Sequence, residues 1–329
     1  METLSCLSIE KKEFDAYIRK IVLKNFNQPA VNIQYLGGGS FGRAFKITLE
    51  DRTNFVLKAF LLQDMHKKEA FELMTLGQST KMKYPNVIKI IDRTDEIPFD
   101  CICMEFINGK CLFKSFSALF LTKKKKRIIA EQIIDSLLET HSLTNDKFGL
   151  IGNPACDTWL QYYKPFATDI YETAREEAKK GTLPKKIMDV MEEAWSLWDK
   201  IFTEDVYTPS LLHGDINIMN IMYEKPLKVT AFIDPLDSRY GDREYELFQL
   251  RSGTGVRFKL YELYKEKYPV SNECDNKNAF YGLWNEVYCF IKTGKIYGFV
   301  MNPLLKRMKK VIKELNKPNY LNVNKSCIS

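Results

Sequence analysis

The chain has 329 residues, of which 45% are hydrophobic and 13% aromatic. This composition excludes a disordered chain and is enough to bury a large core, which at this length favours two packed lobes. The formal net charge of +7 would suit an anionic ligand, but an excess this small points to no particular partner.

Cysteine spacing and hydropathy indicate the setting in which the protein works. The eight cysteines form no C-x-x-C pair and only three histidines accompany them, so we expect reduced thiols and no Cys/His metal site. The N-terminal residues lack an apolar signal core, and no stretch approaches the roughly 18 apolar residues needed to cross a membrane. We therefore expect a cytoplasmic protein without a membrane partner.

In chain order, the first chemical signal is a glycine-rich turn. A helix is predicted over residues 9–23, and Gly37, Gly39 and Gly42 then follow in G-x-G-x-x-G spacing before residues 45–49, which alternate in polarity as a strand does. Glycines let backbone N–H groups approach a phosphate without side-chain obstruction. A dinucleotide-binding turn would lead into a helix, so that class is excluded, while a plain flexible turn stays open as the alternative.

Lys58 strengthens the nucleotide interpretation. It lies on a predicted strand over residues 55–60, and the helix predicted over 65–76 carries Glu69 and Glu72. In this layout a strand lysine contacts the α- and β-phosphates of a nucleotide, and a helix glutamate holds the lysine.

A hinge is predicted at the end of the N-terminal half. Strands are expected over residues 86–92 and 100–107. The apolar run of the second strand ends at Met104, and residues 105–109 are more polar and end in a glycine. We expect the main chain of Glu105 and Ile107 to bind an adenine edge there. An ordinary strand end is the alternative.

The remainder of the chain is predominantly helical. The basic run at residues 123–127 opens a helix with an apolar face, which indicates a solvated helix start rather than a nucleic-acid surface. Aromatic residues over 159–166 and in a helix over 185–202 are expected to pack in a core, although some could line an acceptor pocket. Further helices are predicted over residues 255–267, 275–292 and 303–315.

The densest cluster of chemical signals lies between Leu211 and Leu250. Asp215 follows His213 and Gly214, Asn220 lies five residues on, and Asp234 closes a second apolar run. A carboxylate can orient a hydroxyl hydrogen, while an amide and a second carboxylate supply oxygen ligands for Mg²⁺. A hairpin turning at residues 224–226 would return Asp234 to the same end as Asn220. Either motif alone could be a surface turn or a strand end, but together they indicate a phosphoryl-transfer centre.

This order, H-G-D, four residues, N, then a strand ending in D, resembles the aminoglycoside phosphotransferase and choline kinase superfamily. Within that superfamily the chain looks most like the fructosamine (ketosamine) kinases, from about Leu36 to Leu315. The segments that carry the resemblance are 37–40, 56–58, 69–73, 148–150, 157–163, 211–250, 261–264, 283–286 and 294–297.

The resemblance implies an α+β, two-lobed protein-kinase-like fold. A small β-rich N-lobe with one helix would occupy residues 1–105, and a larger, mainly α-helical C-lobe would occupy residues 106–329. The implied cofactors are ATP and Mg²⁺. The implied roles are Asp215 as catalytic carboxylate, Asn220 and Asp234 as metal ligands, Lys58 as phosphate contact with Glu69 as its partner, and Gly37, Gly39, Ser40 and Gly42 around the nucleotide.

The acceptor side of the resemblance carries both candidates and departures. The residues expected to bind a ketosamine, free or on a glycated lysine, are Asp237, Asp242, Trp159, Trp284 and Glu286. Asp242 is alternatively a buried support for the catalytic loop. Residues 217–219 read Asn-Ile-Met where the family typically has tryptophan, a small residue and glycine, and residues 251–255 replace an expected glycine-phenylalanine segment.

Two other functions stay open on the same residues. One is an aminoglycoside or other antibiotic phosphotransferase, which would need an acidic acceptor pocket. The other is a catalytically silent nucleotide-binding scaffold. The partners that we expect are ATP and a small-molecule hydroxyl acceptor, with no nucleic acid, and the oligomeric state is left without a prediction.

Overall fold

The computed structural model describes residues 11–39, 41–60, 62–115, 118 and 120–318. The chain divides into two compact units. Unit 1 comprises Met1–Ala118 and Met219–Asp237, and unit 2 comprises Leu119–Ile218 and Ser238–Ser329. The division expected from the sequence, between residues 105 and 106, stays a prediction. In the compact units the first segment runs on to Ala118, and Met219–Asp237, from the stretch between Leu211 and Leu250, joins it.

Unit 1 is built on a five-stranded antiparallel sheet with the strand order β1-β2-β3-β5-β4. A second, three-stranded antiparallel sheet has the order β10-β9-β6. The elements of unit 1 are α1 (Lys11–Phe26), β1 (Ala30–Gly38), β2 (Gly42–Leu49), β3 (Asn54–Phe60), α2 (Met65–Ser79), β4 (Val87–Ile91), β5 (Cys101–Glu105), β6 (Lys110–Cys111), η2 (Leu112–Lys114), β9 (Ile221–Glu224) and β10 (Lys228–Phe232).

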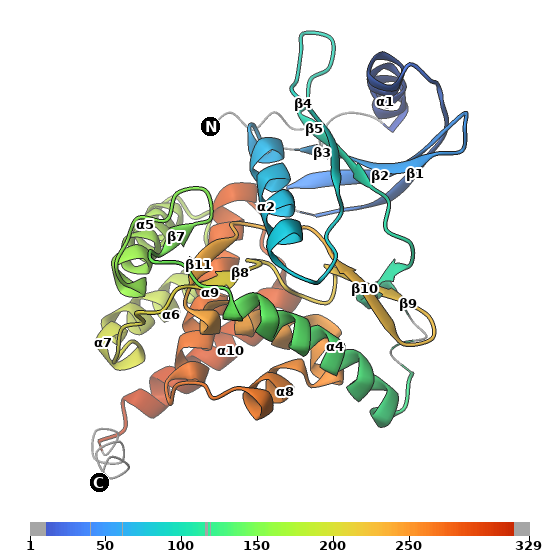
Figure 1. The fold of residues 1–329 in the computed structure, drawn as a ribbon. Coiled ribbons are helices and arrows are strands. Elements are labelled where there is room, and N and C mark those ends of the chain that lie inside the picture. Colours follow the sequence, from blue (N-terminus) through green and yellow to red (C-terminus); the bar gives the residue numbers. More distant parts are fainter. Residues whose placement is uncertain (1–10, 40, 61, 116–117, 119, 319–329) are drawn as a thin grey trace. The chain divides into compact units, whose positions relative to one another are not determined.

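The alternation of buried and polar side chains along β3 decides which face of the sheet Lys58 occupies. Leu57 and Ala59 are buried in one apolar cluster with Phe14 and Ile18 of α1, the helix seen beside the sheet in Figure 1. Successive side chains of a strand point to opposite faces. Lys58 therefore points away from α1, toward the face that remains for a polar site.

Unit 2 is mainly helical, with one short sheet of order β7-β11-β8. Its elements are α4 (Lys123–Ser142), β7 (Gly149–Leu150), α5 (Trp159–Lys179), α6 (Lys185–Ser196), α7 (Trp198–Ile201), β8 (Ser210–Leu212), β11 (Arg239–Gly241), η3 (Arg243–Arg251), η4 (Gly253–Phe258), α8 (Leu260–Lys267), α9 (Cys274–Thr293) and α10 (Gly298–Leu315). An α+β chain with a β-rich N-terminal part and a helical C-terminal part is thus confirmed. Among the described residues, no helix is both long and apolar enough to cross a membrane.

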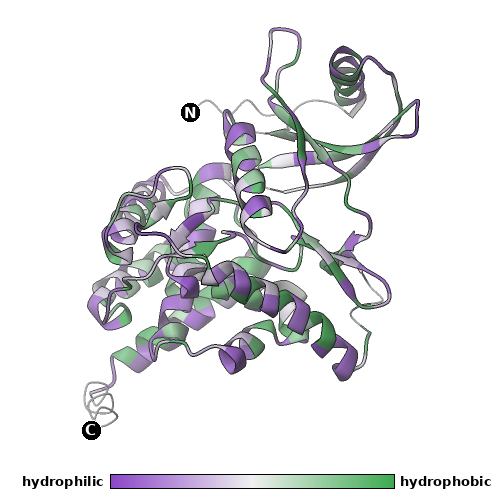
Figure 2. Ribbon diagram, in the orientation of Figure 1, coloured by the Kyte–Doolittle hydropathy of each residue, from purple (hydrophilic) through white to green (hydrophobic). Residues whose placement is uncertain are grey.

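The basic run at residues 123–127 opens α4, as predicted. Thr122 caps this helix, because its side-chain oxygen accepts from the backbone N–H of Lys125 at 3.4 Å. Ile129, Ile133 and Leu137 are buried, so one face of the helix packs in the unit and the other is solvated. Figure 2 shows this change between hydrophilic and hydrophobic residues along the α4 ribbon.

The prediction of one continuous helix over residues 255–267 is wrong. The segment forms the 3-10 helix η4 and then α8, and Lys259 stands between them with φ 53°. A residue in this left-handed region cannot continue a right-handed helix. The helix predicted over residues 185–202 is likewise divided, into α6 and α7, at Leu197.

Candidate active site

Lys58 is held between two carboxylates within unit 1. Its Nζ donates to Oε2 of Glu69 at 2.5 Å and also to Oδ1 of Asp234. The side chains of Lys58 and Glu69 are only 12% and 6% exposed, whereas that of Asp234 is 48% exposed. The predicted pairing of Lys58 with Glu69 is therefore present, and Asp234 joins it from a point 176 residues further along the chain.

Burial and charge act in opposite directions in this cluster. Burial disfavours the charged form of Lys58, but Asp234 and Glu69 outweigh burial and raise the pKa of the ammonium. Burial also raises the pKa of Glu69 to about 8, with Lys58 opposing and the charge of Asp234 reinforcing the shift. Two carboxylates thus compete for one ammonium, and an additional cation would relieve that competition.

Asn220 and Asp234 lie at the same end of a hairpin, as predicted. Strands β9 and β10 pair antiparallel, and the Ile233 N–H donates to the Asn220 carbonyl at 2.9 Å. Asp234 has φ 59°, a conformation that costs energy for a residue other than glycine and that clusters at functional sites. Amide and carboxylate oxygens are ligands that Mg²⁺ prefers, so this pair fits the ion.

The glycine-rich segment forms the turn between β1 and β2 and lies close to Lys58. The Gly39 N–H donates to the Gly42 carbonyl at 3.2 Å. A Cβ on Gly42 would lie 3.0 Å from Cε of Lys58 and 3.0 Å from the Ala59 carbonyl oxygen, so a side chain there would press on the lysine. Gly37 has φ 152°, which an L side chain rarely adopts. Ser40 lies outside the described residues.

Arg43, near the start of β2, contacts the turn and is not among the residues that the sequence predicts. Its Nη1 donates to the carbonyls of both Gly39 and Gly42 at 2.9 Å. The Arg43 side chain therefore holds the two ends of the turn together through their carbonyl oxygens.

The predicted hinge is only partly available for a base. The Glu105 N–H donates to the Asn86 carbonyl at 2.8 Å, and the Glu105 carboxylate binds Asn86 and Lys83. The prediction that the Glu105 N–H is free is therefore wrong, because the Asn86 carbonyl, just before β4, engages it. Within the described residues, no hydrogen bond engages the main chain of Ile107, which stays the hinge candidate.

Asp215 lies in unit 2, in the loop that follows β8, and is half-buried. The side-chain amide of Asn217 donates to its Oδ1 at 2.8 Å, and the Asp215 N–H donates to Nδ1 of His213 at 3.2 Å. Asn217 stands in the segment that departs from the family pattern. In this chain it orients the carboxylate, a role that the sequence analysis did not assign to it.

Buried side chains of η3 hold the same loop. Oε2 of Glu246 accepts from the Gly214 N–H at 2.8 Å, and the Gln249 side-chain amide donates to the Gly214 carbonyl at 2.8 Å. Oε1 of Glu246 lies 2.7 Å from Nε2 of His141. Burial works to raise the pKa of Glu246, but His141 and the Gly214 N–H outweigh it and the pKa is lowered. Glu246 is therefore an ionised anchor of the loop that carries Asp215.

Asp242 is a support residue and is only 2% exposed. Its Oδ1 accepts from the Glu244 N–H at 2.9 Å and so caps η3. Its Oδ2 accepts from Nζ of Lys277 at 2.8 Å and from the Tyr281 hydroxyl at 3.2 Å. Of the two alternatives for Asp242, burial and these partners favour the support of the loop.

Trp159 and Trp284 belong to the core of unit 2, each only 1% exposed. The Trp159 indole donates to the Tyr281 hydroxyl at 2.8 Å, and the Trp284 indole donates to the Ala167 carbonyl at 3.0 Å. The prediction that they contact the acceptor is wrong, because large aromatic surfaces with satisfied N–H groups are stabilised by burial.

The last two acceptor candidates lie in different units. Asp237 belongs to unit 1, where it pairs with Lys68 of α2. Glu286 is half-buried on α9 in unit 2, and burial raises its pKa to about 7. Burial, followed by the charges of Glu286 and Asp215, raises the pKa of Cys289 to about 12, so all three groups share one electrostatic environment. Glu286 therefore remains as an acceptor candidate.

The sequence profile of a family described as fructosamine kinase matches residues 15–311. Among curated proteins, a protein named probable ketoamine kinase from Staphylococcus aureus (strain NCTC 8325 / PS 47) is 32% identical over 89 residues, which cover 27% of this chain and 30% of that protein.

Solved structures share the fold. A candidate fructosamine-3-kinase from Thermobifida fusca superposes with a TM-score of 0.61 at 18% identity, over 90% of this chain and 98% of that chain. The ADP-bound aminoglycoside phosphotransferase APH(2'')-Ib superposes with a TM-score of 0.60 at 17% identity, over 91% and 97%. The predicted protein-kinase-like fold is thus confirmed.

Proposed function

Because the chain belongs to the fructosamine kinase family, we propose that it is an ATP-dependent kinase that transfers the γ-phosphoryl group to a hydroxyl of a ketosamine, free or on a glycated lysine. Family membership supports a small-molecule phosphotransferase. ATP and the ketosamine acceptor are the finer parts of the proposal.

The observation that carries the proposal is the cluster of Lys58, Glu69 and Asp234 beside Asn220. A lysine kept charged by a helix carboxylate can bind the phosphates of a nucleotide. Asn220 and Asp234 would hold Mg²⁺, which when bound neutralises phosphate charge. Structural neighbours crystallised with ADP and with GDP support a nucleotide as the donor, and adenine is the part of the proposal that the ATP assay tests.

Asp215 is the group that would handle the acceptor hydroxyl. Its carboxylate can accept the hydroxyl proton and aim the oxygen at the phosphorus, while Asn217 keeps it from rotating. Glu246 and Gln249 hold the loop at Gly214 on both its N–H and its carbonyl. Such positioning removes motions that would otherwise lower the rate.

Glu286 supports an acceptor that carries an amine. A half-buried carboxylate whose pKa is about 7 gains most from a neighbouring ammonium, because a positive partner restores the charge that burial opposes. A ketosamine places an amine next to its sugar hydroxyls. An aminoglycoside also carries ammonium groups and is therefore the competing acceptor.

The test is phosphorylation of fructosyl-lysine by the purified chain with ATP and Mg²⁺, followed by ³¹P NMR of the product and by ADP release. We expect transfer to a sugar hydroxyl of fructosyl-lysine and little or none to kanamycin. Asp215→Asn should lower kcat by about a hundredfold or more while the Kd for ATP stays within about twofold. Asp146→Asn, at an exposed acid on the same unit, is the matched control and should match wild type.

Two results would overturn the proposal at different levels. Phosphorylation of kanamycin without fructosyl-lysine would exclude the ketosamine and keep the kinase chemistry. Wild-type turnover by Asp215→Asn would exclude the assigned mechanism.

A further inference from the structure

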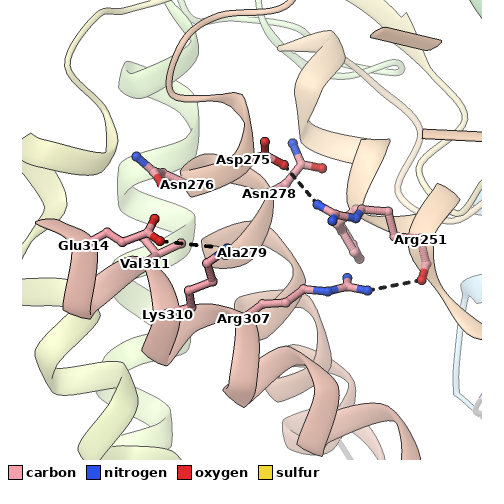
Figure 3. A pocket seen from close by; sticks show the side chains of 10 residues that line it. Arg251, Asp275, Asn276, Asn278, Ala279, Arg307, Lys310, Val311 and Glu314 are labelled. Carbon is pink, nitrogen blue, oxygen red and sulfur yellow. Dashed lines mark hydrogen bonds and ion pairs between the residues drawn. The ribbon is translucent and has the colours of Figure 1, made fainter. Parts of the chain in front are cut away.

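A pocket with a volume of about 230 Å³ lies in unit 2 between η3, α9 and α10 (Figure 3). Its apolar wall is formed by Phe248, Ala279 and Val311. Three basic side chains, Arg251, Arg307 and Lys310, also line it. Two carboxylates, Asp275 and Glu314, line it as well, so the pocket combines an apolar surface with a small excess of positive charge.

The three cations differ in how they are neutralised. Nη1 of Arg251 donates to Oδ1 of Asp275 at 3.0 Å, and its guanidinium lies 4.5 Å from the centre of the Tyr261 ring. Lys310 lies 3.9 Å from Glu314, and its side chain is 77% exposed, so water already solvates its charge.

Arg307 is the cation without a carboxylate of its own. Its Nη2 donates to the backbone carbonyl of Arg251 at 3.4 Å, and no carboxylate in the described part of the chain lies within ion-pair distance of it. Burial, followed by the positive charge of Arg251, lowers the pKa of Arg307, while Asp275 opposes that shift from further away. A half-buried guanidinium next to another guanidinium is an arrangement that a bound anion stabilises.

We propose that this pocket binds a small organic carboxylate, with the carboxylate on Arg307 and Arg251 and a short apolar group against Phe248, Ala279 and Val311. The planar fork of an arginine matches a carboxylate through two parallel N–H donors. A volume near 230 Å³ equals roughly eight water molecules at about 30 Å³ each, which suits a compact molecule such as a benzoate. This site is independent of the proposed kinase reaction.

The pocket shares an element with the catalytic loop. Phe248 and Arg251 belong to η3, and Glu246 and Gln249 of the same 3-10 helix hold Gly214. A ligand on Arg251 would therefore contact the element that anchors the loop carrying Asp215.

Binding of sodium benzoate to the full chain, measured by isothermal titration calorimetry at constant ionic strength, tests the proposal. We expect one site with a dissociation constant on the order of 1 mM or lower. Benzyl alcohol lacks the charge and inorganic phosphate lacks the apolar group, so each should bind at least tenfold more weakly. A dissociation constant for phosphate as low as that for benzoate would contradict the proposed contact of an apolar group with the pocket wall.

Arg307→Gln should weaken benzoate binding at least tenfold, because it removes the charge-assisted hydrogen bonds. Lys306→Gln removes the same charge from the preceding, exposed position of α10 and should leave the affinity within about twofold of wild type. Equal affinity in wild type and Arg307→Gln, or equal weakening by both substitutions, would overturn the proposal.

A measurement on the unaltered protein covers the case in which Arg307→Gln fails to fold. Phenylglyoxal modifies accessible arginines, and mass spectrometry locates the modified side chains. Benzoate should slow the modification of Arg307 and Arg251 severalfold and leave that of exposed Arg52 unchanged. No selective protection of Arg307 would overturn the proposal.

Discussion

Replacement of Glu246 by glutamine tests whether η3 anchors the catalytic loop. The carboxylate is fully buried and accepts from the Gly214 N–H at 2.8 Å, with His141 Nε2 at 2.7 Å. Hydrogen bonds to a charged group contribute about 1.5–3 kcal/mol each. A glutamine at this position has no charge, and its amide can accept a hydrogen bond through its oxygen from only one of the two groups, Gly214 N–H or His141. Its NH₂ group would face the other group, so we expect a loss of about 2–3 kcal/mol in the free energy of unfolding.

The assay is urea denaturation of wild type and Glu246→Gln, followed by tryptophan fluorescence, because the tryptophans named in the core of unit 2 report on that unit. Glu262→Gln is the matched control, since Glu262 is exposed on α8 in the same unit and should change stability by less than about 0.5 kcal/mol. Kinetics should show a reduced kcat with an unchanged KM for ATP, because Glu246 holds the Asp215 loop and does not touch Lys58.

The pH dependence provides the refuting result. The pKa of Glu246 is lowered in the folded protein, so its ionised form contributes stability above the ordinary glutamate pKa of about 4.3. That contribution is lost as the pH falls through the folded pKa. The stability gap between wild type and Glu246→Gln should therefore be full at pH 7 and shrink below about pH 4. An absent gap at pH 7, or one that does not change on acidification, would refute the anchoring role.

Three further predictions follow from the same structure. Trp284→Phe should destabilise unit 2 by about 1–3 kcal/mol in a thermal melt, through lost volume and the lost bond to Ala167, and leave the KM for the acceptor unchanged; a raised KM alone would contradict its place in the core. His66→Gln should weaken ATP binding and lower the melting temperature, because buried His66 lies 2.7 Å from Asp92 and belongs to the first turn of α2, the helix that presents Glu69. An unchanged ATP affinity would show that His66 does not influence the position of Glu69. Burial raises the pKa of Glu286 to about 7, so the folded state loses stability as the pH rises from the unfolded glutamate pKa of about 4.3 to about 7. Glu286→Gln should therefore be more stable than wild type at pH 8, and the difference should shrink toward zero below about pH 4; a difference that grows on acidification would contradict the burial of Glu286.

The sequence by itself determined the local elements and the order of the chemical groups. Alternation along β3 placed Lys58 opposite its apolar neighbours, and the turn between β9 and β10 returned Asp234 to Asn220. Both results depend on residues close in the chain, where a period of two or the length of a turn decides the geometry.

Tertiary structure alone decided which polar groups meet across long separations. Lys58 and Asp234 are 176 residues apart, and His141 and Glu246 are 105 residues apart. Spacing cannot reveal such pairs, because they form only when separate elements pack together.

Tertiary structure also decided between core and pocket for the aromatic residues. Periodicity assigns Trp159 and Trp284 to one face of a helix, but it cannot say whether another element covers that face. Their burial against the other aromatic residues of unit 2 made them core residues, while Glu286, two positions after Trp284, stayed partly exposed. The reason is physical: a face of a helix is a local property, and its burial depends on every element that packs against it.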